Sequence, residues 1–151
     1  MKKNLFKPSV KDEVIERANR LTEQSERQWG SMAPAEMLHH CTDVLKATIS
    51  SKAVSKPDTV KQKVLRFLML NFIPKFPQGK KTSPEIDIKR NNIIVADLQN
   101  EQQQFADLLD VFVNHAGSFK LTHPYFGNLS RNQWGILTWM HLDHHLRQFG
   151  V

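Results

Sequence analysis

Apolar side chains recur every three or four positions in four separate stretches of the chain, which is the spacing of amphipathic α-helices. Ser9 and Ser130 stand at the start of the first and the last stretch as candidate caps. The four predicted helices cover residues 9–29, 31–50, 97–115 and 130–149. The apolar positions of the first three are Val14, Ile15, Ala18 and Leu21; Met37, Leu38, Cys41, Val44, Leu45 and Ile49; and Leu98, Phe105, Leu108, Leu109, Phe112 and Val113.

A long connection separates the second predicted helix from the third. Pro57 opens a shorter amphipathic segment that ends near Pro74, and an irregular loop follows, F-P-Q-G-K-K-T-S-P-E. Two pairs of helices joined by one long connection bury all four apolar stripes most simply as a bundle. The predicted fold class is therefore all-α, a four-helix bundle with a long crossover that carries an extra short helix between helices 2 and 3. A length of 151 residues fits one domain, residues 1–151.

The positive charge of the chain is concentrated in that long connection. The formal net charge is +6, yet residues 52–81 alone carry +7, because eight basic residues there face a single acidic one, Asp58. No helix-turn-helix, zinc-finger or RNA-recognition signature accompanies them, so nucleic acid is not an expected partner. A solvated face near a pocket, or a surface that attracts an anionic ligand, is the favoured interpretation. The basic residues are Lys52, Lys56, Lys61, Lys63, Arg66, Lys75, Lys80 and Lys81.

Cysteine content and apolar runs indicate a reducing compartment and no membrane partner. Cys41 is the only cysteine, which excludes an internal disulfide and cysteine-rich zinc sites. The basic start M-K-K-N-L-F-K lacks the apolar stretch of a secretory signal. The longest apolar run, residues 64–73, is interrupted by Arg66 and Asn71 and is far shorter than the roughly 20 residues of a spanning helix. We expect a cytoplasmic protein.

Three histidines fall within five residues near the end of the last predicted helix, in M-H-L-D-H-H-L-R-Q. At about 100° per residue, His141 and His145 lie about 40° apart on one helix face, with His144 at its edge. Asp143 points away from that face. Imidazoles at positions i and i+4 can reach one metal ion, as in other H-x-x-x-H sites, so this face is a candidate metal site.

A third ligand is predicted on the second helix. His40 shares a side with Met37 and Val44 and should point inward, whereas His39 falls on the polar side. A site of three histidines leaves a metal position open to water or substrate, which is the catalytic arrangement. The alternative is a cluster of core histidines bonded to their neighbours. The residues grouped with His39 on the polar side are Thr42, Asp43 and Lys46.

Other catalytic schemes find less support in the chain. An H-E-x-x-H site would place its general base where this chain has Leu142, so a zinc protease of that type is not predicted. There is no G-x-S-x-G elbow. Cys41 diverges by about 100° from the adjacent His40, so the two cannot form a dyad, and Cys41 is predicted to be a core residue. His115, near a helix C-terminus, is predicted to interact favourably with the helix dipole.

Several segments resemble the DinB/YfiT-like metalloenzyme superfamily, and in particular a bacterial subfamily that ends in the H-L-D-H-H-L-R-Q-F-G pattern. They are P-A-E-M-L-H-H-C, F-P-Q-G-K-K-T-S-P-E, H-P-Y-F-G-N-L-S-R-N-Q-W-G and H-L-D-H-H-L-R-Q-F-G-V. The resemblance covers residues 29–151 and implies a four-helix bundle with one divalent metal ion, nickel or zinc. It implies His40, His141 and His145 as the ligands, a small-molecule substrate such as a low-molecular-weight thiol, and a homodimer.

The leading hypothesis is a metal-dependent transferase or hydrolase in which the ion generates a nucleophile near neutral pH. The alternatives are a non-catalytic helical binding or dimerisation protein, whose histidines order the core, and nucleic-acid binding through the basic connection. Four apolar residues of the short helix suit either a subunit contact or core packing: Val64, Leu68, Leu70 and Phe72. Five further residues are candidates for the surroundings of the metal or for the pocket: Trp134, Thr138, His144, Gln148 and His123.

Overall fold

The structure, a computed structural model, describes residues 2–52, 56–79 and 91–151, and within these ranges it contains five α-helices and no β-strand. The all-α prediction is therefore confirmed for the described residues. None of the helices in these ranges is both long enough and apolar enough to cross a membrane. In chain order the helices are α1 (Pro8–Asn19), α2 (Pro34–Ser50), α3 (Val60–Asn71), α4 (Leu98–Asn114) and α5 (Arg131–Arg147).

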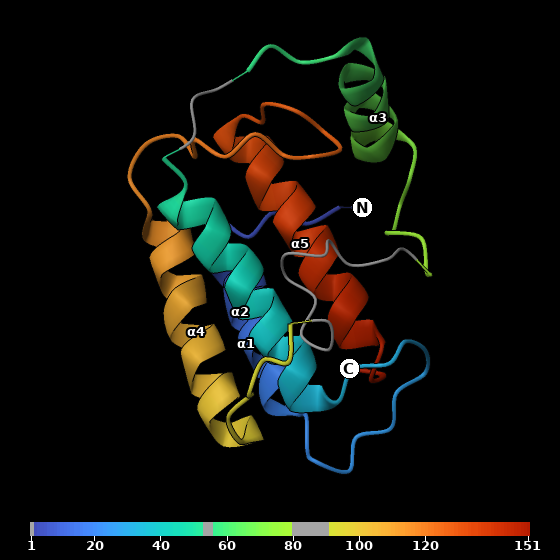
Figure 1. Cartoon of the computed structure of the whole chain (residues 1–151), viewed down its shortest axis with the longest axis vertical. Helices are drawn as coiled ribbons and strands as arrows, with labels where there is room; N and C mark the ends of the chain where they lie inside the picture. The colour runs from blue at the N-terminus through green and yellow to red at the C-terminus, as the bar shows by residue number, and fades with distance from the viewer. Residues whose placement is uncertain (1, 53–55, 80–90) are drawn as a thin grey trace.

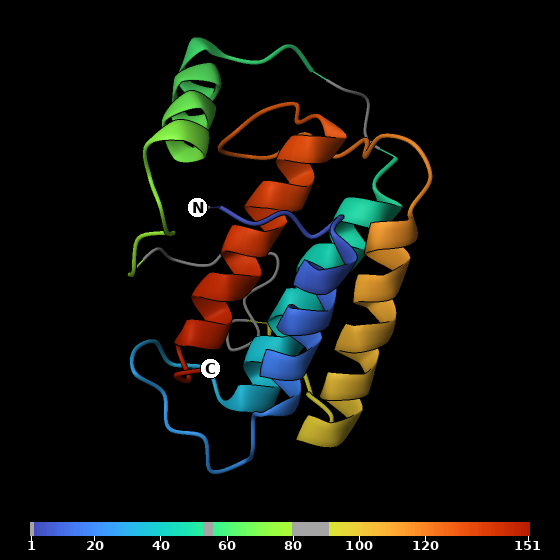
Figure 2. The same ribbon diagram turned by 180° about the vertical axis from the view of Figure 1, so that it is seen from behind.

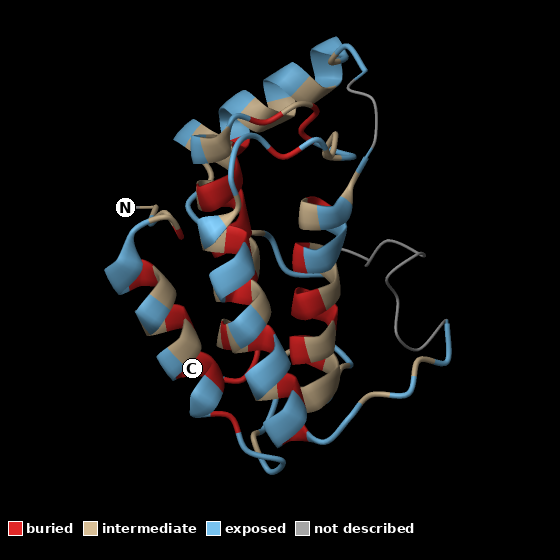
Figure 3. Cartoon of the chain, turned by 90° about the vertical axis from the view of Figure 1, so that its left-hand side faces the viewer, coloured by how far each residue is buried: buried red, intermediate tan, exposed pale blue. Residues whose placement is uncertain are grey.

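Four of the helices lie side by side along the long axis of the molecule, and α3 lies apart from them at one end (Figure 1). On one side α2 packs against α4 and α5, and on the other side α1 packs against the same two helices (Figure 2). Their buried positions face one another in the middle, as the view coloured by burial shows (Figure 3). The fully buried large apolar residues include Val14, Met37, Leu38, Leu45, Phe105, Leu109, Phe112, Met140, Leu142 and Leu146.

Side-chain caps fix where several of the helices begin. The Ser130 hydroxyl accepts a hydrogen bond from the Gln133 amide at 3.3 Å, which confirms the predicted cap of α5. The predicted cap Ser9 is wrong, because α1 already begins at Pro8, a residue whose fixed φ suits the first helical position. Pro57 does not open α3 either. Instead the Thr59 hydroxyl accepts from the Gln62 amide at 3.2 Å.

The first helix is shorter than the apolar pattern predicts. It ends at Asn19 rather than near residue 29, and Leu21 is the last buried apolar residue before an irregular connection that runs to Ala33. Residues 22–28 are polar throughout, so they offer no apolar face that could dock on the other helices. The connection passes beside the end of α5, where the Gln28 amide contacts the Gln148 carbonyl.

A polar tie joins α2 to α4 and corrects the predicted orientation of one side of α2. Glu101 on α4 is 1% exposed, and its carboxylate accepts hydrogen bonds from His39 Nδ1 at 3.1 Å and from the Ala96 amide at 3.2 Å. The side of α2 that carries His39 therefore packs on α4. Thr42, predicted on a polar face, is fully buried there.

Removal of the Glu101 carboxylate should destabilise the fold, because it leaves a half-buried imidazole and a backbone amide without their acceptor. We expect Glu101→Ala to lower the free energy of unfolding by about 2–4 kcal/mol, measured by urea denaturation. Glu101→Gln, which keeps one acceptor oxygen, should lose less. Asp107→Ala on the exposed side of the same helix should stay within about 0.5 kcal/mol of the parent. Equal losses for Glu101→Ala and Asp107→Ala would contradict this role.

Candidate metal centre

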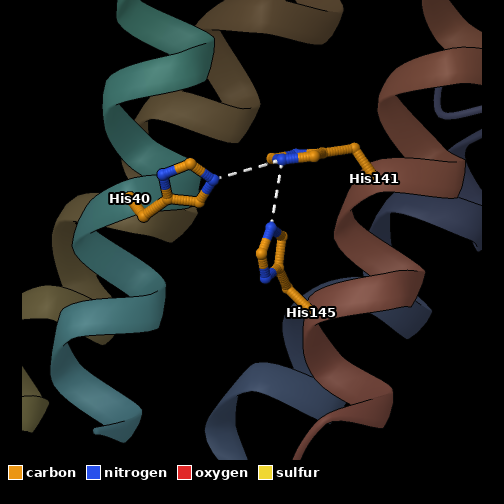
Figure 4. Close-up of side chains that lie close together, drawn as sticks. All are labelled: His40, His141 and His145. Carbon is orange, nitrogen blue, oxygen red and sulfur yellow. Dashed lines mark hydrogen bonds between the residues drawn. The ribbon is translucent and has the colours of Figure 1, made fainter. Parts of the chain in front are cut away.

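Three histidines from two different helices converge in the interior. His40 projects from α2, and His141 and His145 project from α5 towards it (Figure 4). His40 is 3% exposed and His145 is 7% exposed, while His141 is only half-buried. The prediction from helical phase that these three side chains share one region is therefore confirmed by their positions.

The imidazole nitrogens lie at distances suited to a single ion. Nε2 of His141 is 3.3 Å from Nε2 of His40 and 3.1 Å from Nε2 of His145. The ligand atoms of all three residues lie within 4.8 Å of one another. Two imidazole nitrogens bound tetrahedrally to one zinc ion lie about 3.3 Å apart, given Zn–N bonds of about 2.0–2.1 Å. The cluster can thus hold a metal ion after small rotations of the rings.

A neighbouring amide fixes the proton of one of these rings. His145 Nδ1 donates a hydrogen bond to Gln148 Oε1 at 2.7 Å, so the neutral ring carries its proton on Nδ1 and presents a lone pair on Nε2. Gln148 is itself 6% exposed. Gln148 thus lies beside the cluster, where its hydrogen bond can orient His145; its part in the surroundings of a metal stays a prediction.

The connection between α1 and α2 holds Gln148 in place. The Gln28 amide donates to the Gln148 carbonyl at 2.5 Å. Gly30 has φ +87, and a Cβ there would lie 2.5 Å from the side-chain nitrogen of Gln148. Glycine is therefore required at position 30 both for its backbone conformation and for the close approach of the amide.

Burial keeps two of the clustered imidazoles, His141 and His145, uncharged at neutral pH. Desolvation lowers the pKa of His145 to about 3, and the nearby His40 adds to this effect. The pKa of His141 is also lowered well below its usual range, first by desolvation and then by His145 and His40. A metal ion binds the neutral form of imidazole, so these rings are ready to bind at neutral pH without first losing a proton.

The donor set consists of neutral nitrogens alone. Within the described part of the chain, no carboxylate or thiolate belongs to the group of potential ligands. Nδ1 of His141 is buried and has no hydrogen-bond partner among the described residues. Three imidazoles suit zinc and nickel among the divalent ions, and three protein ligands leave a further position open.

One family model matches the chain over residues 2–150, and its description is "Protein of unknown function (DUF1569)". The chain belongs to the DUF1569 family. No curated protein and no solved structure matches it. The match includes all five helices and all three clustered histidines of this DUF1569 protein.

His144 lies next to the cluster in this DUF1569 chain but does not belong to the group of potential ligands. Its ring packs edge-on against His145, with centroids 5.2 Å apart, and against Trp29 at 5.8 Å. Burial lowers the pKa of His144, and a hydrogen bond to the backbone of Phe76 partly opposes this effect. His144 therefore contacts one of the three clustered histidines, and its predicted part in the surroundings of a metal stays a prediction.

Two predicted pocket residues occupy the same helix, N-terminal to the histidine pair. Thr138 is 6% exposed and lies three residues before His141 on α5. Trp134 is 3% exposed and packs edge-on against Phe119. Both side chains are thus part of the buried face of α5, and their contribution to a pocket stays a prediction.

His123 is held by the loop that precedes α5. Its Nδ1 accepts hydrogen bonds from the amides of Tyr125 at 3.2 Å and Phe126 at 3.3 Å, so the neutral ring carries its proton on Nε2. The ring packs on Phe126 and Trp134, with centroids 4.6 and 5.8 Å away. Desolvation lowers the pKa of His123 to about 4, and its charge would be felt at His141. This loop residue therefore lies near the cluster as a fixed hydrogen-bond donor.

The sequence did not reveal what fixes the His123 loop. Arg66 on α3 donates to the Asp58 carboxylate at 2.7 Å and to the carbonyls of Phe126 and Asn128, while the Asn128 amide donates to Asp58 at 2.7 Å. These hydrogen bonds hold the pKa of Asp58 below its usual range, chiefly through the Asn128 amide. The sequence does single out Asp58, because it is the one acidic residue among eight basic ones in residues 52–81. A count of charges does not identify Arg66 as its partner.

Several other predicted placements can now be compared with the structure. Cys41 is buried with its Sγ 3.7 Å from the Met37 sulfur, and burial raises the pKa of the thiol, so its core role is confirmed. Asp143 lies outside the cluster and pairs with Arg17 at 3.0 Å and Arg147 at 2.8 Å. Leu70 packs on the core. His115 ends α4 and stacks on Phe119.

Among the basic residues of the connection, Lys80 and Lys81 lie outside the described residues, as does most of the loop F-P-Q-G-K-K-T-S-P-E.

The lowered histidine pKa values predict a pH-dependent stability of the metal-free protein. An unfolded histidine takes up a proton near pH 6.5, whereas folded His145 and His123 do so only near pH 3 and 4. The unfolded state therefore binds more protons between these values, and stability falls as the pH drops below about 6.5. Each histidine should contribute about 1–2 kcal/mol of loss between pH 7 and 5.

Urea unfolding at pH 7 and pH 5 in the presence of a chelator measures this loss. His123→Asn serves as the matched variant, because an amide oxygen can replace Nδ1 as the acceptor while the group no longer titrates. The variant should lose less stability than the parent between the two pH values. An identical loss in both proteins would rule out His123 as a source.

Proposed function

We propose that this chain is a metal-dependent enzyme with a DinB/YfiT-like four-helix bundle in a single domain, in which His40, His141 and His145 bind one divalent ion. The observation that carries the proposal is the convergence of three imidazoles from α2 and α5, with nitrogens 3.1 and 3.3 Å apart. The pairing of α2 with α5 in the core supports it. The resemblance of the C-terminal H-L-D-H-H-L-R-Q-F-G segment supports the superfamily.

Zinc and nickel are the ions we propose for the site. Imidazole nitrogen is a ligand of intermediate softness that suits zinc, nickel, copper and iron, whereas magnesium and calcium prefer oxygen ligands. The cluster offers nitrogen alone among the described residues. A divalent ion held there would supply a Lewis acid that makes a water molecule or a thiol nucleophilic near neutral pH.

The residues of the chain itself would bind, orient and shield the reactants. His145 is kept in one tautomer by Gln148, so its Nε2 lone pair faces the site continuously. His141 is the most exposed residue of the three, although its Nδ1 is buried. His123, with its proton on Nε2, would donate a hydrogen bond to a substrate atom near His141, and the buried Trp134 would exclude water.

The electrostatics of the site support an anionic substrate. Three imidazole ligands would leave the double charge of a divalent ion uncompensated, which would favour an anionic substrate such as a thiolate. Exposed lysines of the connection between α2 and α4 would attract such a substrate, and those described are Lys52, Lys56, Lys61, Lys63 and Lys75. We therefore propose a small thiol as the co-substrate of a transferase, with a hydrolase as the second reaction class.

Metal content tests the proposal directly. Protein produced without an affinity tag and loaded with zinc or nickel should contain one metal ion per chain by elemental analysis. His141→Ala should lose it, since two nitrogens from different helices hold an ion poorly. His115→Ala, which removes an imidazole in contact with Phe119, should keep the full content. A parent protein without stoichiometric metal would instead support the non-catalytic helical binding or dimerisation module, whose histidines order the core.

The same proteins distinguish the two reaction classes. Loaded protein is incubated with panels of electrophiles and esters, with and without a low-molecular-weight thiol. A transferase consumes thiol in proportion to product, whereas a hydrolase turns over without it. Turnover that persists in metal-free His141→Ala would overturn the assignment of the site.

The hydrogen bond to Gln148 should tune metal affinity. Gln148→Leu removes the acceptor of the His145 Nδ1 proton while it retains the bulk of the side chain, and we expect a loss of metal affinity of about 10- to 100-fold. Gln148→Glu keeps an acceptor oxygen and should retain most of the affinity. Competition with a chromogenic chelator measures both. Equal affinities for the parent and Gln148→Leu would show that the hydrogen bond has no part in binding.

A further inference from the structure

The helix α3 carries an apolar face that the other described residues leave uncovered. It stands apart from the four packed helices, and its contact with them is to α5 (Figure 1). Val60, Val64 and Phe67 are 77%, 50% and 58% exposed, and Phe72 just beyond the helix is 68% exposed. Positions 60, 64, 67 and 68 share one helix face, so these side chains form a continuous stripe. We call Val60, Val64, Phe67, Leu68 and Phe72 the α3 stripe.

Lysines border the α3 stripe on both sides. At about 100° per residue, Lys61 lies about 100° to one side of Val60 and Lys63 about 60° to the other. Both are exposed, as are Lys56 and Lys75 at the two ends of the segment. The only carboxylate in the described residues 56–79 is Asp58, and its partner is Arg66. The described surface around the stripe therefore carries an excess of positive charge, with four exposed lysines and one carboxylate.

The stripe is too small, and of the wrong charge, for a stable contact between two copies of the chain through this helix alone. A helix of 12 residues is about 18 Å long and about 10 Å wide, whereas a stable dimer buries roughly 800 Å² on each partner. Two copies of the stripe would also bring lysines together without a carboxylate to pair with. A broad surface that is apolar beneath a layer of negative charge complements both features.

We propose that the α3 stripe lies on an anionic lipid membrane, with Phe67 and Phe72 inserted at the level of the acyl chains and Lys61 and Lys63 reaching the phosphate groups. An apolar helix face bordered by lysines is the pattern of helices that lie in the plane of the membrane interface. Lysine stems can pack along apolar surface while the ammonium groups remain at the headgroups. A helix in this position needs no spanning segment, so the inference departs from the sequence-based expectation of no membrane partner, which rested on the absence of such a segment.

The proposal is independent of the metal site. Binding depends on the side of α3 that faces away from α5, whereas the opposite side of the helix carries Met69, which is 7% exposed, and Arg66, which holds the His123 loop. Substitutions in the stripe therefore leave these inward contacts in place. Loss of metal should not change membrane binding, and the two proposals can fail separately.

Co-sedimentation with lipid vesicles tests the inference. The full chain should bind vesicles of phosphatidylcholine mixed with phosphatidylglycerol and should not bind vesicles of phosphatidylcholine alone. Phe67→Ser should weaken binding at least about tenfold, because it removes the exposed aromatic ring of α3. Val111→Ser, which alters a 51% exposed apolar residue on α4, is the matched control and should bind like the parent.

Charge reversal provides the second arm. Lys61→Glu with Lys63→Glu should also weaken binding at least about tenfold, whereas Lys120→Glu, at an exposed lysine elsewhere, should have little effect. Circular dichroism and urea unfolding verify that each variant is folded. Equal binding to neutral and anionic vesicles, or no binding to either, would overturn the proposal. So would self-association by sedimentation velocity that Phe67→Ser abolishes, since a second copy would then cover the stripe.

Discussion

Three imidazole rings must stay uncharged in one small region between α2 and α5, and the rest of the site depends on this constraint. Two rings protonated at 3.1 Å from each other would repel strongly in a region with little water. Desolvation prevents this by lowering the pKa values of His141 and His145 below the physiological range. The interior thus holds His141 and His145 as neutral nitrogen donors at close range to His40, an arrangement with a high capacity to bind a cation.

The positions of these rings are set by helix packing and by one hydrogen-bonded link. His141 and His145 have a fixed separation on α5, but their distance from His40 depends on how closely α2 approaches α5. The tie between His39 and Glu101 holds α2 on α4, and the pair of Arg17 with Asp143 holds α5 on α1. Just beyond α5, the backbone carbonyl of Gln148 accepts a hydrogen bond from the Gln28 amide in the connection after α1. The side chain of Gln148 in turn accepts from Nδ1 of His145. The connection therefore helps to hold the residue that sets the tautomer of a proposed ligand.

Much of this arrangement follows from helical phase. His40 shares a side with the buried Met37, and His141 and His145 share a face through their i and i+4 spacing, so their inward orientation could be predicted from the sequence. Phase gives the direction of a side chain but not the neighbour it meets. For this reason phase places Thr42 on a polar face although it is fully buried, and it predicts neither the Glu101 tie nor the Arg66 hydrogen bonds. The predicted end of the first helix near residue 29 is also wrong. The residues after Leu21 are polar and have no apolar face to pack on the other helices, and α1 ends at Asn19.

A purely structural histidine cluster would be expected to look different in its hydrogen bonding. Buried polar atoms in folded proteins are nearly always paired, and a core histidine usually bonds its two nitrogens to separate protein groups. Here Nε2 of His141 faces Nε2 atoms of two other histidines, and only one proton can lie between each pair. His145 has already committed its proton to Gln148, so its Nε2 can only accept. His141 could donate to one neighbour at most, and its Nδ1 would still lack a partner among the described residues. A single cation resolves the conflict at Nε2 by accepting all three lone pairs, and it leaves Nδ1 of His141 protonated on the side away from the ion. This arrangement of nitrogen atoms, more than the residue types alone, favours an ion-binding role over a structural one.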